Sequence, residues 1–582
     1  MATESLLSMF PPVPTEQWER MIREAAPGPD YAAKLIWHPE EGLAVRPYYR
    51  AEDLAGLSFV DARPGEFPFV RGTRIHGGWR IREEIDAIDP EKGNQLAIES
   101  VAAGAEEVAF QRARIQNESN VALLLANLNE IPVHIAGANH RSIRLLLERL
   151  KKRPHQAGLS ADLDPLADIE FSAEIIRDLA AEFRPFVFDA RDFHEKGAGA
   201  IEEIGFLLSA AVDFLAEMQD RGVAIDRIAS AIAFRFAMGP DFFVQIAKLR
   251  AFRMVWAQTL ESFGGGGERA KAVIHASPSR WNETVYDRHV NVLRSTIEAI
   301  SAVLGGADSI SVTPFDECCK TSEDGSRRLA RNIQIILKRE ALFDRVADPL
   351  GGSYLIEVLT NSIATKSWEL FRELESAGGY RKATEAGIIP SMLEHRAKGR
   401  EDAFAARRSV LVGTNRFADI AEKSADFSDA PVHGSKQRVA CMFEDLRMRT
   451  ERYAAAHGQL PLIVLAEIGD AKMRRARSQF VADFLACAGL PTEVRLFETP
   501  GQIAASPADL IVLCSSDAEY LLLAQELMPT LRMQKRQALV FIAGNPATAE
   551  QLTSLGIAGF IHLRSYANRV LREIQRQLGI KD

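Results

Sequence analysis

The stretch RIASAIAFRF (227–236) has the apolar run that is typical of a buried β-strand. An amphipathic segment follows at 240–262, and the pattern then repeats with KAVIHA (271–276), a helical segment at 284–303 and SISVTP (309–314). A helix between consecutive strands returns the chain to the same end of the sheet. We therefore expect each strand to lie parallel to the one before it.

The same alternation extends toward the amino terminus, with helices predicted at 139–152 and 200–220. Five further strands are predicted at WRIREEI (79–85), EEVAF (106–110), IPVHIAG (131–137), LADIEF (166–171) and PFVFDA (185–190). The helix after the eighth strand is expected to carry one apolar face made of Leu329, Ile333, Ile336 and Leu337. Eight strand–helix units over 61–345 predict an α/β fold, a TIM (β/α)8 barrel, with any chemistry at the carboxyl ends of its strands.

The rest of the chain divides into four predicted regions. Residues 1–60 form an extended, proline-punctuated arm with one short helix near 16–25, and 346–423 form a helical connection. Residues 424–437 are rich in Ser, Asp, Pro and Gly, which indicates a linker. Within 438–582, five more strands are predicted at PLIVLA (461–466), EVRLF (493–497), DLIVLC (509–514), ALVFIAG (538–544) and GFIHL (559–563). This second alternation predicts a flavodoxin-like doubly wound domain.

Composition excludes several classes of protein. The 582 residues carry a net charge of −9, which lacks the basic field expected of a nucleic-acid-binding protein. The five cysteines are too few for a disulfide framework. No apolar run approaches the roughly 18 residues that span a bilayer, and the amino terminus makes a poor signal peptide. We therefore expect a cytoplasmic protein with no membrane partner.

Five motifs give a more specific indication. They are PGEFPFVRGTR (64–74), QIAKLRAFRMVWA (245–257), RRLARNIQIILKRE (327–340), DPLGGSYLIEVLT (348–360) and VGTNRF (412–417). Their sequence and order resemble the methylmalonyl-CoA mutases over nearly the whole chain. The resemblance implies a barrel threaded by CoA and joined to a cobalamin-binding domain. It also implies the interconversion of methylmalonyl-CoA and succinyl-CoA by adenosylcobalamin chemistry.

The barrel departs from the catalytic members of that family. Their segment after the first motif continues into TMYxxRPWTIRQ, whereas this chain runs through TRIHGG to WRIREE and keeps only Arg74 and His76 as polar candidates. Catalytic members also carry a histidine in GYHMQEAGA, which hydrogen-bonds the thioester carbonyl. The matching ARDFHEKGA places Asp192 at that position and His194 two residues later. An ionised carboxylate has no proton to donate to a carbonyl oxygen.

The cobalamin loop departs further. Members that bind the cofactor use DxHxxG after the first strand of the last domain, with the histidine as lower cobalt ligand. The three matching positions here are Ala471, Met473 and Ala476. The neighbouring Arg474, Arg475 and Arg477 crowd the loop. Two later family signatures also differ. At the SxL signature this chain has Ser515, Ser516 and Asp517, and at the paired glycines of the fourth strand it has Ala543-Gly544. We therefore predict no catalytic, cofactor-binding or metal-binding residue on this chain.

Four other features are expected to have structural or surface roles. The adjacent Cys318 and Cys319 follow the eighth strand but have no third metal ligand in view. Residues 264–267 are a glycine run without the strand-to-helix context of a phosphate loop. His140 is expected to be a surface residue at a helix start. A solvated stripe or an interface is expected for Arg327, Arg328 and Arg331.

Because the architecture is intact but the sites are altered, we expect that this chain acts through the surface it offers to a partner. We expect the non-catalytic small subunit of a heterodimeric mutase, paired with a large catalytic subunit that carries the adenosylcobalamin, with the amino-terminal arm on that partner. Acyl-CoA binding by this chain is not expected. Two alternatives remain open: a self-sufficient acyl-CoA mutase with a displaced site, and an acyl-CoA-binding regulatory protein. The sequence leaves open which acyl-CoA is rearranged and whether the barrel channel is open.

Overall fold

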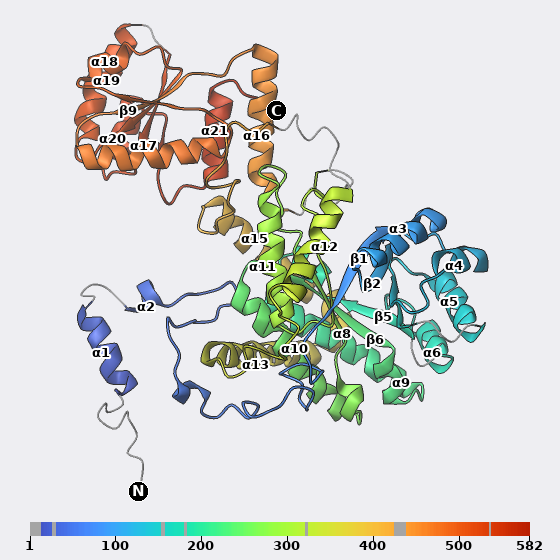
Figure 1. Cartoon of the computed structure of the whole chain (residues 1–582). Coiled ribbons are helices and arrows are strands. Elements are labelled where there is room, and N and C mark those ends of the chain that lie inside the picture. Colours follow the sequence, from blue (N-terminus) through green and yellow to red (C-terminus); the bar gives the residue numbers. More distant parts are fainter. Residues whose placement is uncertain are drawn as a thin grey trace.

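Two parallel β-sheets, a closed barrel and an open five-stranded sheet, contain the named strands of this chain. The structure is a computed structural model, and Figure 1 shows the barrel strands in blue to green and the second sheet in orange to red. It describes residues 13–25, 31–152, 157–179, 183–319, 324–423, 438–534 and 537–581. The linker predicted at 424–437 lies outside the described residues.

The barrel confirms the predicted fold of the first large region. Its strands run in chain order, every neighbouring pair is parallel, and the eighth pairs with the first. The strands are β1 (Arg80–Asp86), β2 (Glu107–Gln111), β3 (Val133–Ile135), β4 (Leu159–Leu163), β5 (Phe183–Asp189), β6 (Ile232–Met238), β7 (Ile274–Pro278) and β8 (Ser309–Ser311). The helices among and after them are α3 (Pro90–Ala102), α4 (Glu118–Leu124), α5 (His140–Lys152), α6 (Ile169–Arg177), α7 (Arg191–Glu195), α8 (Ala200–Asp220), α9 (Ile225–Ser230), α10 (Phe242–Ser262), η2 (Gly267–Ala270), α11 (Val290–Leu304) and α12 (Asp324–Arg339).

One predicted strand is wrong. LADIEF (166–171) was expected to be the fourth strand, but the strand is LSADL at Leu159–Leu163, and 169–177 form α6. The Asp168 carboxylate accepts the amide proton of Phe171 (3.0 Å), so it caps the start of a helix. The true strand alternates buried and half-buried residues, which is the pattern of a barrel strand with a short apolar core.

Two element boundaries and the buried face of one helix also differ from the predictions. The first part of RIASAIAFRF belongs to α9, because the strand begins only at Ile232. The helix predicted from residue 284 begins at Val290. On α12, Ile333 and Leu337 are buried as expected, but Leu329 and Ile336 are exposed. Only half of the predicted apolar face of α12 is therefore buried in the core of this chain.

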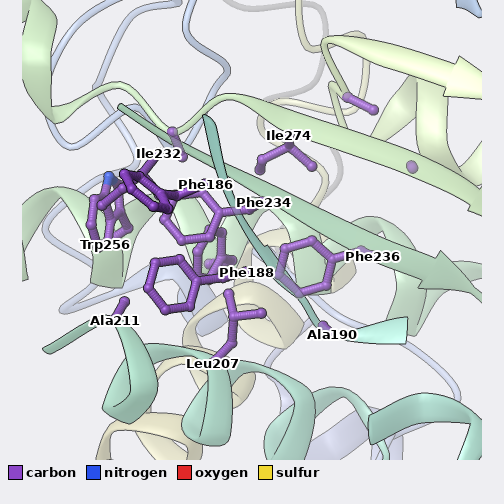
Figure 2. Packing of buried hydrophobic residues seen from close by; sticks show 14 of the residues in the cluster. Phe186, Phe188, Ala190, Leu207, Ala211, Ile232, Phe234, Phe236, Trp256 and Ile274 are labelled. Carbon is purple, nitrogen blue, oxygen red and sulfur yellow. The ribbon is translucent and has the colours of Figure 1, made fainter. Parts of the chain in front are cut away.

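The core between the barrel and its outer helices is dominated by aromatic side chains. Figure 2 shows Phe186 and Phe188 of β5 beside Phe234 of β6 and Trp256 of α10. The Phe234 ring meets the Trp256 ring edge-on, with centroids 4.7 Å apart. Helix α8 closes this side of the barrel, where its Leu207 is also fully buried. The strands β5 and β6 are therefore packed tightly against the outer helices α8 and α10.

The helical connection contains α13 (Tyr354–Ser376), α14 (Gly379–Glu385) and α15 (Ile388–Ala405). A buried ion cluster ties α13 to the barrel. Arg250 of α10 pairs with Asp348 and with Glu357 (2.7 Å), and Arg71 lies 3.1 Å from each of the same two carboxylates. These four side chains come from three of the motifs that resemble the mutase family. In this chain, the motifs therefore meet in a structural cluster.

The second sheet has the strand order β10-β9-β11-β12-β13, all parallel. Its strands are β9 (Ile463–Glu467), β10 (Glu493–Leu496), β11 (Leu510–Cys514), β12 (Leu539–Ala543) and β13 (Gly559–Ile561). The helices of this part are α16 (Cys441–His457), α17 (Ala471–Ala486), α18 (Pro500–Ala504), α19 (Tyr520–Met533), α20 (Ala549–Leu555) and α21 (Ala567–Gln577). Four of the five strands lie within the ranges predicted from the sequence, and β9 extends one residue past its predicted end.

The amino-terminal arm carries α1 (Thr15–Ala25), α2 (Tyr31–Leu35) and η1 (Ala51–Leu54), and Figure 1 shows α1 apart from the barrel. Helix α1 has no buried residue, although its Trp18 ring touches Tyr48. Over the described ranges, we found no helix with the length and apolar character that a membrane span requires.

Candidate functional site

The interior of the barrel contains large polar side chains that bond to one another. Arg235 of β6 hydrogen-bonds with His134 of β3, a contact that crosses the barrel because these strands are not neighbours. Arg82 of β1 donates to Glu107 of β2 (Nε to Oε1, 2.8 Å), and His275 of β7 hydrogen-bonds with Ser309 and Ser311 of β8. The four cationic or imidazole side chains are buried. The Arg235–His134 contact therefore lies across the interior of the barrel.

These contacts also fix the charge state of the interior. Burial lowers the pKa of His134 and of His275, and the nearby Arg235 and Arg82 lower both further. Both imidazoles are therefore neutral at pH 7. Arg235 is compensated by Asp162 and Asp189, each 3.3 Å from its Nη1. These four interior side chains are therefore each bonded to another side chain of the barrel.

A cavity of about 250 Å³ lies at the carboxyl ends of β1, β2 and β8, the end where barrels of this class do their chemistry. Its arginines already have carboxylate partners. The ion pairs are Arg82–Glu107, Arg112–Asp86, Arg280–Glu317, Arg327–Asp324 and Arg331–Glu83. Burial pushes the pKa of Glu84 upward, but Arg191, Arg280 and Arg235 outweigh it, so the pKa is lowered and this carboxylate is ionised.

The first two predicted candidates lie away from this cavity. Arg74 donates to Gly78 O (2.6 Å) and lies 3.6 Å from Asp308, which precedes β8 and so marks the amino-terminal end of the barrel. His76 is exposed. In the structure, neither residue lines the cavity at the carboxyl ends of the strands.

His194 belongs to a buried chain of three side chains. Its Nδ1 hydrogen-bonds with Glu203 Oε1 (2.9 Å) and its Nε2 with Ser279 Oγ (2.7 Å). This connectivity matches that of a Ser–His–acid triad. However, Ser279 is 1% exposed, and Glu203 is also paired with Lys248 at 2.8 Å. Burial lowers the pKa of His194, although Glu203 raises it. The bonded side chains of Ser279, His194 and Glu203, with Lys248, connect α7, α8 and α10. Asp192, two residues before His194, is exposed.

In the second sheet, the loop between β9 and α17 is shaped by a helix cap. The Asp470 carboxylate accepts the amide proton of Met473 (2.7 Å), which places Met473 in the first turn of α17. The other two matched positions, Ala471 and Ala476, bear only methyl side chains. The loop therefore offers no imidazole to a metal, and the one carboxylate at its start is used by the backbone.

The crevice at the carboxyl ends of β9, β11 and β12 is filled. Arg477 of α17 donates to Tyr520 Oη and to Asp517 Oδ1, both at 2.8 Å. Tyr520 in turn donates to Ala543 O (2.6 Å), the last residue of β12. A Cβ at Gly544 would lie 2.8 Å from Arg477 Nη1, so the guanidinium occupies the space beside this glycine. These side chains therefore bond to one another across the carboxyl edge of the sheet.

The two serines that follow β11 are also engaged locally. Ser515 and Ser516 each donate a hydroxyl proton to Glu519 Oε2 (2.6 Å). These hydrogen bonds lower the pKa of Glu519 to about 2. The segment therefore forms a turn that starts α19 and presents no free hydroxyl to a ligand.

The remaining candidates have structural surroundings. Cys318 and Cys319 are both buried with sulfurs 3.7 Å apart, and Cys318 donates to Thr284 O. His140 is exposed at the start of α5, with its ring stacked on Phe171. The glycine run 264–267 joins α10 to η2. In the described part of the chain, no three His, Cys, Asp or Glu side chains are arranged to hold a metal ion.

Sequence reasoning missed the barrel network and the Arg477–Tyr520 contact. A signal for the first existed, because His134, Arg235 and His275 interrupt otherwise apolar strands, whereas Arg82 lies in the largely charged strand RIREEID. No pattern in the sequence predicts that Tyr520 meets Arg477, because α17 and α19 belong to different core clusters and these two side chains meet only at the carboxyl edge of the sheet.

Comparison with known proteins identifies relatives of this chain. The family model described as methylmalonyl-CoA mutase matches residues 164–476. The chain is 34% identical to the methylmalonyl-CoA mutase small subunit of Porphyromonas gingivalis over 99% of each chain. It is 31% identical to the small subunit from Streptomyces virginiae, over 94% of each. A methylmalonyl-CoA mutase of Rhizobium meliloti is 29% identical over 66% of this chain and 61% of that protein.

Proposed function

The chain belongs to the methylmalonyl-CoA mutase family, and on that premise we propose that it is the non-catalytic small subunit of a heterodimeric, adenosylcobalamin-dependent enzyme. The partner would be a large catalytic subunit that interconverts methylmalonyl-CoA and succinyl-CoA. In this proposal the cobalamin and the reacting acyl-CoA belong to the partner. This chain supports the partner through its surface.

The observation that carries the proposal is the filled crevice of the second sheet. Arg477 and Tyr520 occupy the space beside Gly544, and Met473 stands where the cofactor-binding relatives carry an imidazole. A thioether is a weak ligand, and no carboxylate is free behind it to orient a replacement. The strand order β10-β9-β11-β12-β13 supports a flavodoxin-like assignment for this sheet, which we infer is a degenerate cobalamin-binding domain.

The barrel supports the same proposal from the substrate side. The Arg235–His134 contact and the Arg82–Glu107 pair lie across the path that an acyl-CoA would thread. Moving these side chains aside would break buried, compensated charges, which costs several kcal/mol. We therefore infer that this chain does not bind the reacting acyl group.

Co-expression with a candidate large subunit tests the proposal. The expected result is co-purification as a 1:1 complex by sizing, with mutase activity in the complex and none in the isolated small chain supplied with adenosylcobalamin. Turnover by the isolated chain would replace the proposal with that of a self-sufficient mutase.

One observation favours a second candidate, an acyl-CoA-binding regulatory protein. A cavity of about 400 Å³ lies at the amino-terminal ends of β5 to β7 and is lined by Arg184, Arg227, Arg269 and Lys271. Arg184 has a buried Nε without a hydrogen-bond partner, and no carboxylate in the described residues pairs with it. Such a basic cavity would suit the phosphates of CoA. Calorimetry with methylmalonyl-CoA and succinyl-CoA separates the candidates: saturable binding that is lost in Arg184→Ala supports this one, and flat titrations remove it.

A further inference from the structure

A small cavity joins the amino-terminal arm to the barrel. It has a volume of about 50 Å³, and its walls include Glu40 and Glu41 of the arm, Glu203 of α8, and Asp241 and Gln245 at the start of α10. The arm is held here by the Glu41 carboxylate, whose Oε1 accepts the amide proton of Ala200 (3.2 Å), the first residue of α8. The cavity thus lies where three segments distant in the sequence meet.

Oxygen atoms without partners gather at this cavity. Glu41 and Gln245 are each only 5% exposed, yet Glu41 Oε2 and Gln245 Oε1 have no hydrogen-bond partner. Asp241 occupies the position before the first turn of α10, but its carboxylate makes no capping bond. Asp241 and Gln245 are four residues apart and joined by the Gln245 N to Asp241 O bond (3.0 Å), so they share one helix face.

The charges around the cavity do not balance. Four carboxylates line it: Glu40, Glu41, Glu203 and Asp241. Arg400 pairs with Glu40, and Lys248 pairs with Glu203, so each nearby cation is already used. His194 is buried and shares Glu203, and burial lowers its pKa, so it adds no charge at pH 7. In the described residues, neither the buried Glu41 nor the half-buried Asp241 forms an ion pair, and Lys248 and Arg400 act on them only through longer-range electrostatics. Carboxylates removed from water are normally paired or coordinated to a metal.

We propose that this cavity binds one hard divalent cation, Mg²⁺ or Ca²⁺, through Glu41, Asp241 and the amide oxygen of Gln245. Two carboxylates match a charge of +2, and carboxylate and amide oxygens are the ligands that these cations prefer. A water molecule needs about 10–15 Å³, so the cavity has room for a cation with some of its waters. Water would complete the coordination, because the protein supplies fewer oxygens than either ion requires.

The proposed cation departs from the expectation that this chain holds no metal. It would tie the arm to α10 and so set the direction in which the arm leaves the barrel. The competing way to neutralise the cavity is a proton. A carboxylate must lose its proton before it binds a cation, so cation binding at this cavity should compete with protonation of its carboxylates.

Terbium luminescence tests the site directly, because Trp281 lines the cavity and can sensitise a bound Tb³⁺. With the full-length chain, we expect saturable Tb³⁺ emission on tryptophan excitation and its displacement by Mg²⁺ or Ca²⁺. Glu41→Gln and Asp241→Asn should each weaken Tb³⁺ binding at least tenfold, and Trp281→Phe should remove the emission without removing binding. Glu16→Gln, on the exposed face of the same arm, is the matched control.

A stability measurement gives an independent readout. Mg²⁺ or Ca²⁺ at millimolar concentration should raise the Tm of the wild type at pH 8 and leave the Tm of Glu41→Gln and Asp241→Asn unchanged. Three results would overturn the proposal: no sensitised emission, emission that persists in both variants, or a Tm that responds to pH but not to either cation. The third result would assign the neutralisation to a proton on Glu41.

Discussion

At the scale of single residues, buried charge is the most informative feature of this chain. Some buried carboxylates have strong partners, as in the Arg71–Arg250–Asp348–Glu357 cluster. Others have almost none, and burial then raises their pKa. Glu298 of α11 is one of the second kind: burial raises its pKa to about 8, against a single hydrogen bond from Asn282 Nδ2 (2.8 Å) and the charge of Arg294.

Glu298 should make the chain less stable as the pH rises. The folded state holds this proton up to a pH of about 8, whereas the unfolded state releases it near 4.5, so the unfolding free energy falls between these values. The full difference corresponds to about 4–5 kcal/mol. Glu298→Gln has no proton to lose and should be more stable than the wild type at pH 8 and similar at pH 5. Urea unfolding at both pH values measures this, with the exposed Glu394→Gln as control. Equal pH dependence in wild type and Glu298→Gln would show that Glu298 titrates normally.

Arg250 should be essential for stability. Its two partners, Asp348 and Glu357, are buried, so Arg250→Ala leaves carboxylates without their main compensation and should lower the unfolding free energy by about 3–5 kcal/mol. Denaturant unfolding measures the loss. Arg345→Ala, at a mostly exposed arginine, should change it by less than about 0.5 kcal/mol. If the two variants lost equal stability, the cluster would not support the fold.

At the scale of secondary-structure elements, the sequence predicted most strands because a parallel sheet buries both faces and leaves long apolar runs. Seven of the eight predicted barrel strands overlap real ones, and the exception, LADIEF, fails for a local reason: Asp168 caps a helix within an apolar run. The apolar run alone does not distinguish a strand from a buried helix.

The candidate site was predictable to a different degree. The loss of the histidine at Met473 and of the thioester-binding histidine at Asp192 can be read from the sequence, because single positions carry these roles. The contacts that fill the spaces cannot. Arg235 meets His134 only because the barrel closes, and Arg477 of α17 meets Tyr520 of α19 only because both helices begin at the carboxyl edge of the second sheet.

Helix α1 leaves most of its surface exposed, although Trp18 and Glu19 contact Tyr48. Its Met21 is 57% exposed, and none of its residues is buried. If the arm docks on the large subunit as proposed, Met21→Glu should weaken the complex at least about tenfold, since it places a charge on the apolar face of the helix. The unfolding free energy of the isolated chain should stay within about 0.5 kcal/mol of the wild type.

Surface plasmon resonance with immobilised large subunit measures the change in affinity. Glu16→Gln, on the same helix, should bind as the wild type does. An unchanged affinity of Met21→Glu would remove α1 from the interface while leaving the rest of the proposal in place.

At the scale of the whole molecule, both the barrel and the second sheet carry polar side chains that bond to one another. Arg235 hydrogen-bonds with His134 inside the barrel, and Arg477 with Tyr520 at the carboxyl edge of the second sheet. In the proposed function, these side chains occupy the spaces that would hold substrate and cofactor, and the chain supports its partner through its surface.

The most direct test of this account is a spectrophotometric titration of the isolated chain with adenosylcobalamin. We predict that the corrin absorption spectrum stays that of the free cofactor at every protein concentration, while the large subunit titrated in parallel changes it. A saturable spectral change with the small chain alone would contradict the account, because it would mean that this polypeptide binds the cofactor itself.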